Sequence, residues 1–375
     1  MFKCLRKACS ILPFPLHFFL CLLVILLLFN LVTAERLPVK TYTVADGLPR
    51  DSVRKIKQDS RGFLWFCTLD GISRFDGEAF TNFTTGDGLP ERHVNDFLES
   101  KTGTIWVATD GGLARLNPSG IPNSQDNPLF TVILPEDPRA SSIQVLFEDE
   151  GGSIWMGTNH GLYQLSGNSL RPFDLGITDR GLDTQAVGSI MKDHRGTIWI
   201  GIGNGICRVM ADGRVERFTP ENGLPESSVS KLYEDKKGRV WAGFRAGGSA
   251  ALVMLAAEPL KNQNIVEALY REKDGLPADW VTDLLETSDG KFWVGTTRGL
   301  CEWQGGDSSV RKTYRTKNDL CDGEIWSLAE DTDANLWLGS QCGAKKWSRY
   351  GFTSYHEIHG MDGQLANSIF TRKSG

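Results

Sequence analysis

The chain has 375 residues, eight cysteines, 40% hydrophobic residues and a formal net charge of −5. A mildly acidic balance argues against nucleic acid and anionic membrane surfaces as partners, because both require a basic face. The length is large for one compact core, so we expect repeated units that pack on their neighbours.

Residues 1–34 have the pattern of a secretory signal peptide. Three basic residues precede an apolar run at 18–29, and small residues at 32–34 form a cleavage site. The alternative is an uncleaved membrane anchor, since the apolar run is close to the minimum length for spanning. In both cases we expect the rest of the chain to be exported, periplasmic or otherwise extracytoplasmic, and membrane-associated if this segment is retained.

A motif centred on tryptophan recurs seven times, at intervals of 41 to 52 residues. Gly follows each of these tryptophans by six residues, and Val or Ile precedes each by twelve. A period in the forties with one Trp per unit is typical of propeller blades. The recurring tryptophans are Trp65, Trp106, Trp155, Trp199, Trp241, Trp293 and Trp337.

Each unit predicts four short strands, named A to D in chain order and joined by hairpin turns. Val53 and Ile56 lie three residues apart in the first A strand, so we expect them to point to opposite faces. Apolar residues on both faces indicate that sheets lie on both sides, as in stacked blades. We therefore predict that the seven tryptophans fill the space between blades and do not bind a ligand.

The predicted fold is all-β, a seven-bladed β-propeller of four-stranded antiparallel blades over residues 35–349. Residues 40–44 are expected to pair with the last blade, because ring closure removes exposed strand edges. Residues 350–375 are expected to be an incomplete eighth repeat, the start of a truncated second propeller. A first strand begins there, and the sequence ends before a hairpin or a Trp.

Turns with the sequence Asp/Asn-Gly-Leu-Pro precede four of the A strands, at 46–49, 87–90, 222–225 and 274–277. Together with the V-x-x-I strand, the D-x-x-G hairpin and the W-x-G-T-x-x-G-L strand pair, they resemble the two-component regulator propeller family over nearly all of residues 38–375. The turn is missing from the third and fourth units, and Cys321 takes its Pro position in the seventh.

The resemblance implies an extracytoplasmic input region of a membrane receptor. Family members continue into a Y_Y_Y-type β-domain, a membrane span and a histidine kinase or other output domain, none of which is in this sequence. The expected function is ligand sensing or interaction in two-component signalling, with dimerisation in a full-length receptor. The expected partner is an unknown small molecule, with a saccharide among the candidates, or a protein.

The sequence predicts no catalytic constellation, no metal site and no cofactor, and hence no enzyme. His356 and His359 form a lone pair near the chain end, and residues 331–335 lack the Gly and Glu of a calcium loop. We interpret 331–335 as an A–B hairpin. Propeller folds also host enzymes, so two alternatives stay open: a lyase or hydrolase acting at the central axis, and a non-catalytic docking scaffold.

The D–A connections and the B–C turns emerge at the same face, because the strands alternate in direction. Residues that differ between units at this rim are where specificity can reside. Trp280 offers a ring for stacking, and the arginines can bind carboxylates bidentately. Solvated loop residues without a ligand are the alternative. The predicted recognition residues are His93, Arg245, Trp280, Arg298 and Glu324.

We also predict a disulfide between Cys321 and Cys342. Both belong to loops at the same face of the seventh unit, and an oxidising compartment lets such a bond persist. Unpaired thiols are the alternative. Cys67 occupies a position that is Gly or Ala in other units, so we expect it in the core.

Overall fold

The computed structural model describes residues 39–122, 124–176, 186–245, 252–256, 263–304, 309–314 and 323–348. The expected signal segment, at 1–34, and the expected eighth repeat, at 350–375, lie outside these ranges and stay predictions. Within these ranges no helix has the length and apolar character that a membrane crossing needs.

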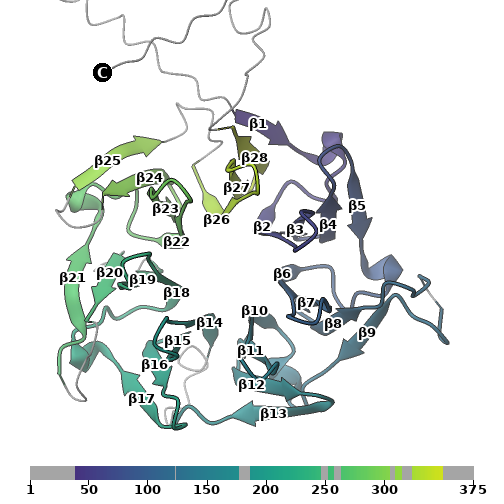
Figure 1. Ribbon diagram of the computed structural model, residues 1–375, viewed down its shortest axis with the longest axis horizontal. Helices are drawn as coiled ribbons and strands as arrows, with labels where there is room; N and C mark the ends of the chain where they lie inside the picture. The colour runs from purple at the N-terminus through teal and green to yellow at the C-terminus, as the bar shows by residue number, and fades with distance from the viewer. Residues whose placement is uncertain are drawn as a thin grey trace, which may run out of the picture. The chain divides into compact units, whose positions relative to one another are not determined.

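Seven four-stranded antiparallel sheets stand around a common axis, each with its A strand innermost (Figure 1). This confirms the predicted seven-bladed propeller. Blades 1 to 3 consist of β2 (Val53–Gln58), β3 (Leu64–Thr68), β4 (Gly71–Phe75) and β5 (Phe80–Phe83); β6 (Val94–Glu99), β7 (Ile105–Thr109), β8 (Gly112–Leu116) and β9 (Phe130–Ile133); and β10 (Ile143–Glu148), β11 (Ile154–Thr158), β12 (Gly161–Ser166) and β13 (Ser169–Phe173).

Blades 4 to 7 follow in the same order around the ring. They consist of β14 (Val187–Lys192), β15 (Ile198–Ile202), β16 (Gly205–Val209) and β17 (Val215–Phe218); β18 (Val229–Glu234), β19 (Val240–Phe244), β20 (Leu252–Leu255) and β21 (Val266–Tyr270); β22 (Val281–Glu286), β23 (Phe292–Thr296), β24 (Gly299–Gln304) and β25 (Ser309–Tyr314); and β26 (Ile325–Glu330), β27 (Leu336–Ser340), β28 (Gly343–Trp347) and β1 (Val39–Tyr42).

The N-terminal strand β1 closes the ring by supplying the outer strand of blade 7. It pairs antiparallel with β28, with Val39 opposite Trp347 and Tyr42 opposite Ala344. The expected closure by residues 40–44 is therefore confirmed. Chain segments some 300 residues apart in sequence complete one sheet, which leaves no open blade edge at the junction.

All seven recurring tryptophans are buried between blades, as predicted. Trp337 of blade 7, for example, shares a core cluster with Val53 and Ile56 of blade 1. Five of the seven indole N–H groups donate to an aspartate in the A–B hairpin of the same blade, as Trp241 does to Asp235 at 2.9 Å. In these five blades the large ring supplies both apolar area and a satisfied polar group, whereas the Trp106 indole N–H is buried without a partner among the described residues.

The A strands are not regular, and this corrects one expectation. In every blade the register with strand B skips the second residue of strand A, which is a β-bulge. Val53 pairs with Thr68 and Ile56 with Phe66, two positions apart on strand B. Val53 and Ile56 therefore point to the same face, toward the preceding blade, and not to opposite faces.

The Asp/Asn-Gly-Leu-Pro turns form short 3₁₀-helices at the blade junctions. These are η1 (Val44–Asp46), η2 (Thr85–Asp87), η4 (Pro220–Asn222) and η5 (Glu272–Asp274), and η3 (Pro138–Ala140) replaces them before blade 3. Each motif glycine caps its helix in the left-handed region, as Gly47 does with φ 110°. The following leucine is buried, as Leu48 and Leu276 are.

A side chain from each A strand joins its blade to the A–B hairpin of the preceding blade. Glu286, for example, accepts a hydrogen bond from the Lys236 N–H at 2.7 Å. Equivalent acceptors serve five more junctions at 2.6–2.9 Å, including Gln58 between blades 7 and 1. At the remaining junction, between blades 3 and 4, the charges are exchanged. The A strand supplies the cation, Lys192, which pairs with Glu150 of the preceding A–B hairpin.

Candidate functional site

The seven bulged residues line a cavity of about 600 Å³ at the axis of the ring. A bulge re-aims a side chain, and here the side chains line the channel. They differ in every blade, in contrast to the Val or Ile directly before each of them and the apolar residue two positions after. The bulged residues are Arg54, Asn95, Gln144, Gly188, Ser230, Thr282 and Trp326.

This axial cavity opens at the end of the ring where the A strands begin. Residues from the B–C turns, among them Asp110, Asn159 and Arg245, complete its wall. The A–B hairpins lie at the other end, because A strands run away from the cavity toward them. A volume of this size falls in the range of small-molecule sites.

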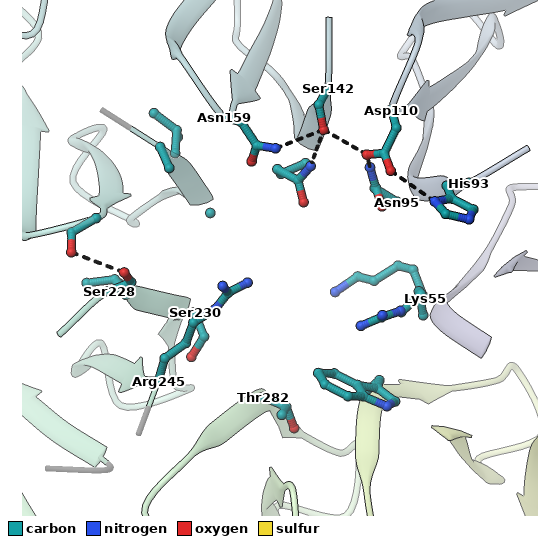
Figure 2. A pocket seen from close by; sticks show the side chains of 18 of the residues that line it. Lys55, His93, Asn95, Asp110, Ser142, Asn159, Ser228, Ser230, Arg245 and Thr282 are labelled. Carbon is teal, nitrogen blue, oxygen red and sulfur yellow. Dashed lines mark hydrogen bonds and ion pairs between the residues drawn. The ribbon is translucent and has the colours of Figure 1, made fainter. Parts of the chain in front are cut away.

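One wall, from blades 2 and 3, is a hydrogen-bonded network around Asp110 (Figure 2). Its carboxylate contacts His93 Nδ1 at 3.1 Å and accepts from Asn95 Nδ2 at 2.8 Å and Ser142 Oγ at 2.7 Å. Asn159 Nδ2 donates to Ser142 Oγ at 3.0 Å. Although burial raises the pKa of Asp110, the bonds from Asn95, Ser142 and His93 outweigh it and hold that pKa below its usual value.

The opposite wall, from blades 5, 6, 7 and 1, carries cations on aromatic rings. The Arg54 guanidinium lies 4.5 Å from the centre of the Trp326 ring. Trp326 meets Trp280 edge to face at 5.8 Å. The Arg245 guanidinium lies 5.7 Å from the Trp280 ring. We refer to these four residues as the Arg–Trp wall.

A buried charge cluster lies just beyond the cavity on the A strands. Asp283, almost fully buried, binds Lys231 at 2.6 Å and Lys55 at 3.4 Å, and it accepts the Leu328 N–H at 3.0 Å. Burial raises the pKa of Asp283, but the two ammonium groups and the N–H prevail and bring it to about 2. Of this cluster, Lys55 reaches the cavity lining.

The structure brings three of the five predicted recognition residues to the axial cavity, namely His93, Arg245 and Trp280. Arg298 lies at the same end, since the neighbouring Thr297 N–H donates to the Trp280 carbonyl at 3.2 Å. Its guanidinium, however, forms an ion pair with Glu272 of η5. Arg298 is not among the residues that line the cavity.

Glu324 also lies at this rim outside the cavity lining. Gly323, its neighbour, packs within 3.1 Å of the Arg298 backbone, measured from the position a Cβ would take. Glu324 Oε2 is buried and has no hydrogen-bond partner among the described residues. Binding of a ligand by the five predicted residues stays a prediction.

Sequence reasoning missed Arg54 and Trp326, because the predicted rim used only the residue before each A strand and the B–C turns. A signal was available in the V-x-x-I motif. Two core residues three apart cannot face the same neighbour on a regular strand, so a shared face requires a bulge between them. The variable second position of the A strand was therefore the place to look.

The cysteines divide as expected into core and rim. Cys67, Cys207 and Cys301 are buried free thiols, and burial raises the pKa of Cys207 to about 12. Cys342 is disulfide-bonded. Cys321 lies outside the described residues, so the pairing of Cys342 with Cys321 stays a prediction.

Metal binding has no support in the part of the chain that the structure describes. No group of three or more His, Cys, Asp or Glu side chains there is arranged to hold a metal ion. Residues 331–335 form the A–B hairpin of blade 7, with Asp331 accepting the Trp337 indole N–H at 2.7 Å.

Seven four-stranded blades around a polar axial cavity define this chain as a β-propeller with a ligand-sized site. Residues 223–245 and 275–298 match the family model described as "Two component regulator propeller". The resemblance seen in the sequence is thereby confirmed, with the two matched segments falling in the fifth and sixth repeats. It is also 49% identical over 41 residues to Histidine kinase P4 of Formosa agariphila, a match that covers 11% of this chain and 3% of that protein.

Solved structures with the same fold include receptors and enzymes. The extracellular domain of the hybrid two component system BT3049 from B. thetaiotaomicron aligns with a TM-score of 0.68 and 21% identity, covering 84% of this chain and 41% of that one. A catalytically inactive histidine-to-alanine variant of virginiamycin B lyase from Staphylococcus aureus, with quinupristin, aligns with a TM-score of 0.63 and 12% identity, covering 82% and 98%. At these identities the likeness shows the fold alone. The chain spans less than half of the receptor domain.

Proposed function

We propose that this chain is an extracytoplasmic ligand-sensing propeller of a two-component signalling receptor, and that the axial cavity is its ligand site. The observation that carries the proposal is the contrast within each A strand. Residues that pack between blades recur around the ring, whereas the bulged residue at the cavity differs in every blade. A cavity whose lining residues differ from blade to blade is expected of a binding site on a repeated scaffold.

The sensing role draws further support from the relatives. Both the family model and the BT3049 domain belong to two-component systems. A receptor domain of this kind binds its ligand without converting it and transmits occupancy through a population shift to domains that follow it.

A thermal-shift screen of the purified chain tests this proposal. The panel contains neutral monosaccharides and disaccharides, sugar acids, amino acids and aromatic acids. We expect at least one compound to raise the melting temperature of the wild-type chain, as binding to the folded state requires. The shift should be lost in Trp280→Ala, and mass spectrometry should recover the compound unchanged. No shift across the panel, or a shift that Trp280→Ala retains, contradicts the proposal.

A second function, catalysis at the axis, is favoured by the contact between His93 and Asp110. A carboxylate that contacts Nδ1 can orient an imidazole for general acid–base chemistry, and a lyase shares the fold. If the compound that binds is recovered as a product, and His93→Ala retains binding but abolishes conversion, the chain is a propeller enzyme and not a sensor.

A further inference from the structure

The Arg–Trp wall holds two guanidinium groups that have no carboxylate partner among the described residues. Arg54 lies on β2 and is half-buried, and Arg245 directly follows β19 and is exposed. Burial and the charge of Arg245 both lower the pKa of Arg54, while the charges of Glu324 and Asp110 raise it to a lesser extent. Two like charges thus act on each other beside the cavity, with no direct counterion in the described part of the chain.

The remaining charges of the lining do not neutralise this pair. Lys55 adds a third cation, because it shares the single carboxylate of Asp283 with Lys231. Figure 2 shows Lys55 and Arg245 reaching into the cavity from facing walls. Asp110 already receives hydrogen bonds from Asn95 and Ser142 and contacts His93. The lining therefore carries an excess of positive charge, which favours an anionic ligand.

The same wall offers a hydrogen-bond donor without an acceptor. The indole Nε1 of Trp326 is buried and has no partner among the described residues. A buried N–H left unpaired costs about 1–3 kcal/mol, so an acceptor atom of a ligand that reaches it is stabilising. Trp326 lies within 4.5 Å of Arg54, which places this donor beside the positive charge.

We propose that the axial cavity binds a small ring-bearing carboxylate, with the carboxylate at Arg54 and Arg245 and the ring against Trp280 and Trp326. The proposal rests on the proposed ligand-sensing function and specifies its ligand class. Guanidinium groups match carboxylates bidentately, and indole faces pack on flat apolar surfaces of aromatic or sugar rings. Cationic ligands are excluded by the three basic side chains of the lining.

Isothermal titration of the full chain with two matched pairs of probes tests the ligand class. Glucuronate is compared with glucose, and benzoate with benzamide, so that each pair differs chiefly in the carboxylate. We expect at least one acid to bind about tenfold or more tightly than its neutral partner, the effect of one charge-assisted hydrogen bond. The pair that responds distinguishes a sugar ring from an aromatic one.

Variants then locate the binding site. Arg245→Gln, an exposed position, should weaken binding of the acid about tenfold and leave folding intact. Trp326→Phe retains a ring but removes the unpaired N–H, so it should weaken binding severalfold. Arg214→Gln, in the exposed C–D turn of blade 4, is the matched control and should bind as the wild type does.

Failure of this proposal is distinguishable from failure of the sensing function. Binding of glucose or benzamide as tightly as the acids, or binding of an acid that Arg245→Gln leaves unchanged, overturns the carboxylate site while ligand sensing stands. Absence of binding by all four probes at millimolar concentration also overturns it. The sensing function fails only if the broader thermal-shift panel fails.

Discussion

The two ends of the ring are built in different ways. At the hairpin end, nearly every blade uses the same device, a side chain near the end of strand A that accepts the backbone N–H of the preceding A–B hairpin. At the cavity end the B–C turns of five blades share a Thr or Ser hydroxyl that donates to a glycine carbonyl of the same turn, but the contacts among the side chains that line the cavity do not recur. A carboxylate network occupies blades 2 and 3, and the Arg–Trp wall occupies blades 5, 6, 7 and 1.

The bulge explains how one strand can serve both ends. It leaves the apolar residues of V-x-x-I on one face, where they pack on the preceding blade, and aims the residue directly after the first of them at the axis. The ring can therefore keep its inter-blade packing while the cavity lining changes. Under the proposed function, the packing residues of each A strand carry stability and its bulged residue carries ligand specificity.

The largest expected effect comes from a tryptophan between blades. Trp241 is fully buried and bonded to Asp235, so Trp241→Ala should lower the free energy of unfolding by about 4 kcal/mol. Trp280→Ala, at the partly exposed Arg–Trp wall, should cost far less stability yet abolish ligand binding. Urea unfolding of the two variants checks this, and equal losses of stability would contradict the division of roles.

The buried charge cluster gives the next largest effect and a pH dependence. Asp283→Asn leaves Lys55 and Lys231 without their shared carboxylate, and we expect a loss of about 3 kcal/mol at pH 7. Because the folded pKa of Asp283 is about 2, below the usual value of about 4, its contribution is present above about pH 4 and is lost as the pH falls toward about 2.

Urea unfolding midpoints at pH 7 and pH 3 test this second effect. The wild type should lose more stability than Asp283→Asn between the two pH values, because the variant lacks the group that titrates. Asp212→Asn, in an exposed turn, is the control and should follow the wild type. A parallel loss in wild type and Asp283→Asn would show that the cluster does not stabilise the ring.

A smaller effect is expected at the hairpin end. Glu286→Ala removes the acceptor of the Lys236 N–H, and we expect a loss of about 1.5 kcal/mol for one hydrogen bond to a charged group. Glu78→Ala, an exposed residue of a C–D turn, should change stability by less than about 0.5 kcal/mol. Thermal unfolding compares the two, and ligand affinity should be unaffected in both.

The smallest effect is a gain of stability. Ala334 has φ 60° at a hairpin position where the other six blades have glycine with positive φ. Ala334→Gly should therefore stabilise the chain by up to about 1 kcal/mol. In the reciprocal change, Gly290→Ala, the added Cβ has no neighbouring atom within 4 Å. Its expected loss of stability, about 1 kcal/mol, therefore comes from the backbone conformation alone. Stabilisation by both changes would contradict this reading.

The fold could be predicted from sequence because its determinants repeat. Trp241 and its six counterparts are visible as a period, and the closure by β1 follows from the count of outer strands. The cavity was harder to predict, because non-repeating residues have no period to reveal them. Arg54 and Trp326 were missed since period-two reasoning assumes a regular strand. Arg298 was placed at the correct rim, but backbone position does not say that its side chain turns to Glu272.

Hydrogen exchange measured by mass spectrometry, with and without the compound that most raises the melting temperature, tests the central claim most directly. We predict that added protection is confined to the starts of the A strands and the B–C turns, in peptides covering residues 52–56, 280–282 and 324–327. The A–B hairpins at the other end should exchange as before. Protection of the hairpin end or of the outer strands, with none at these peptides, would contradict the assignment of the axial cavity as the ligand site.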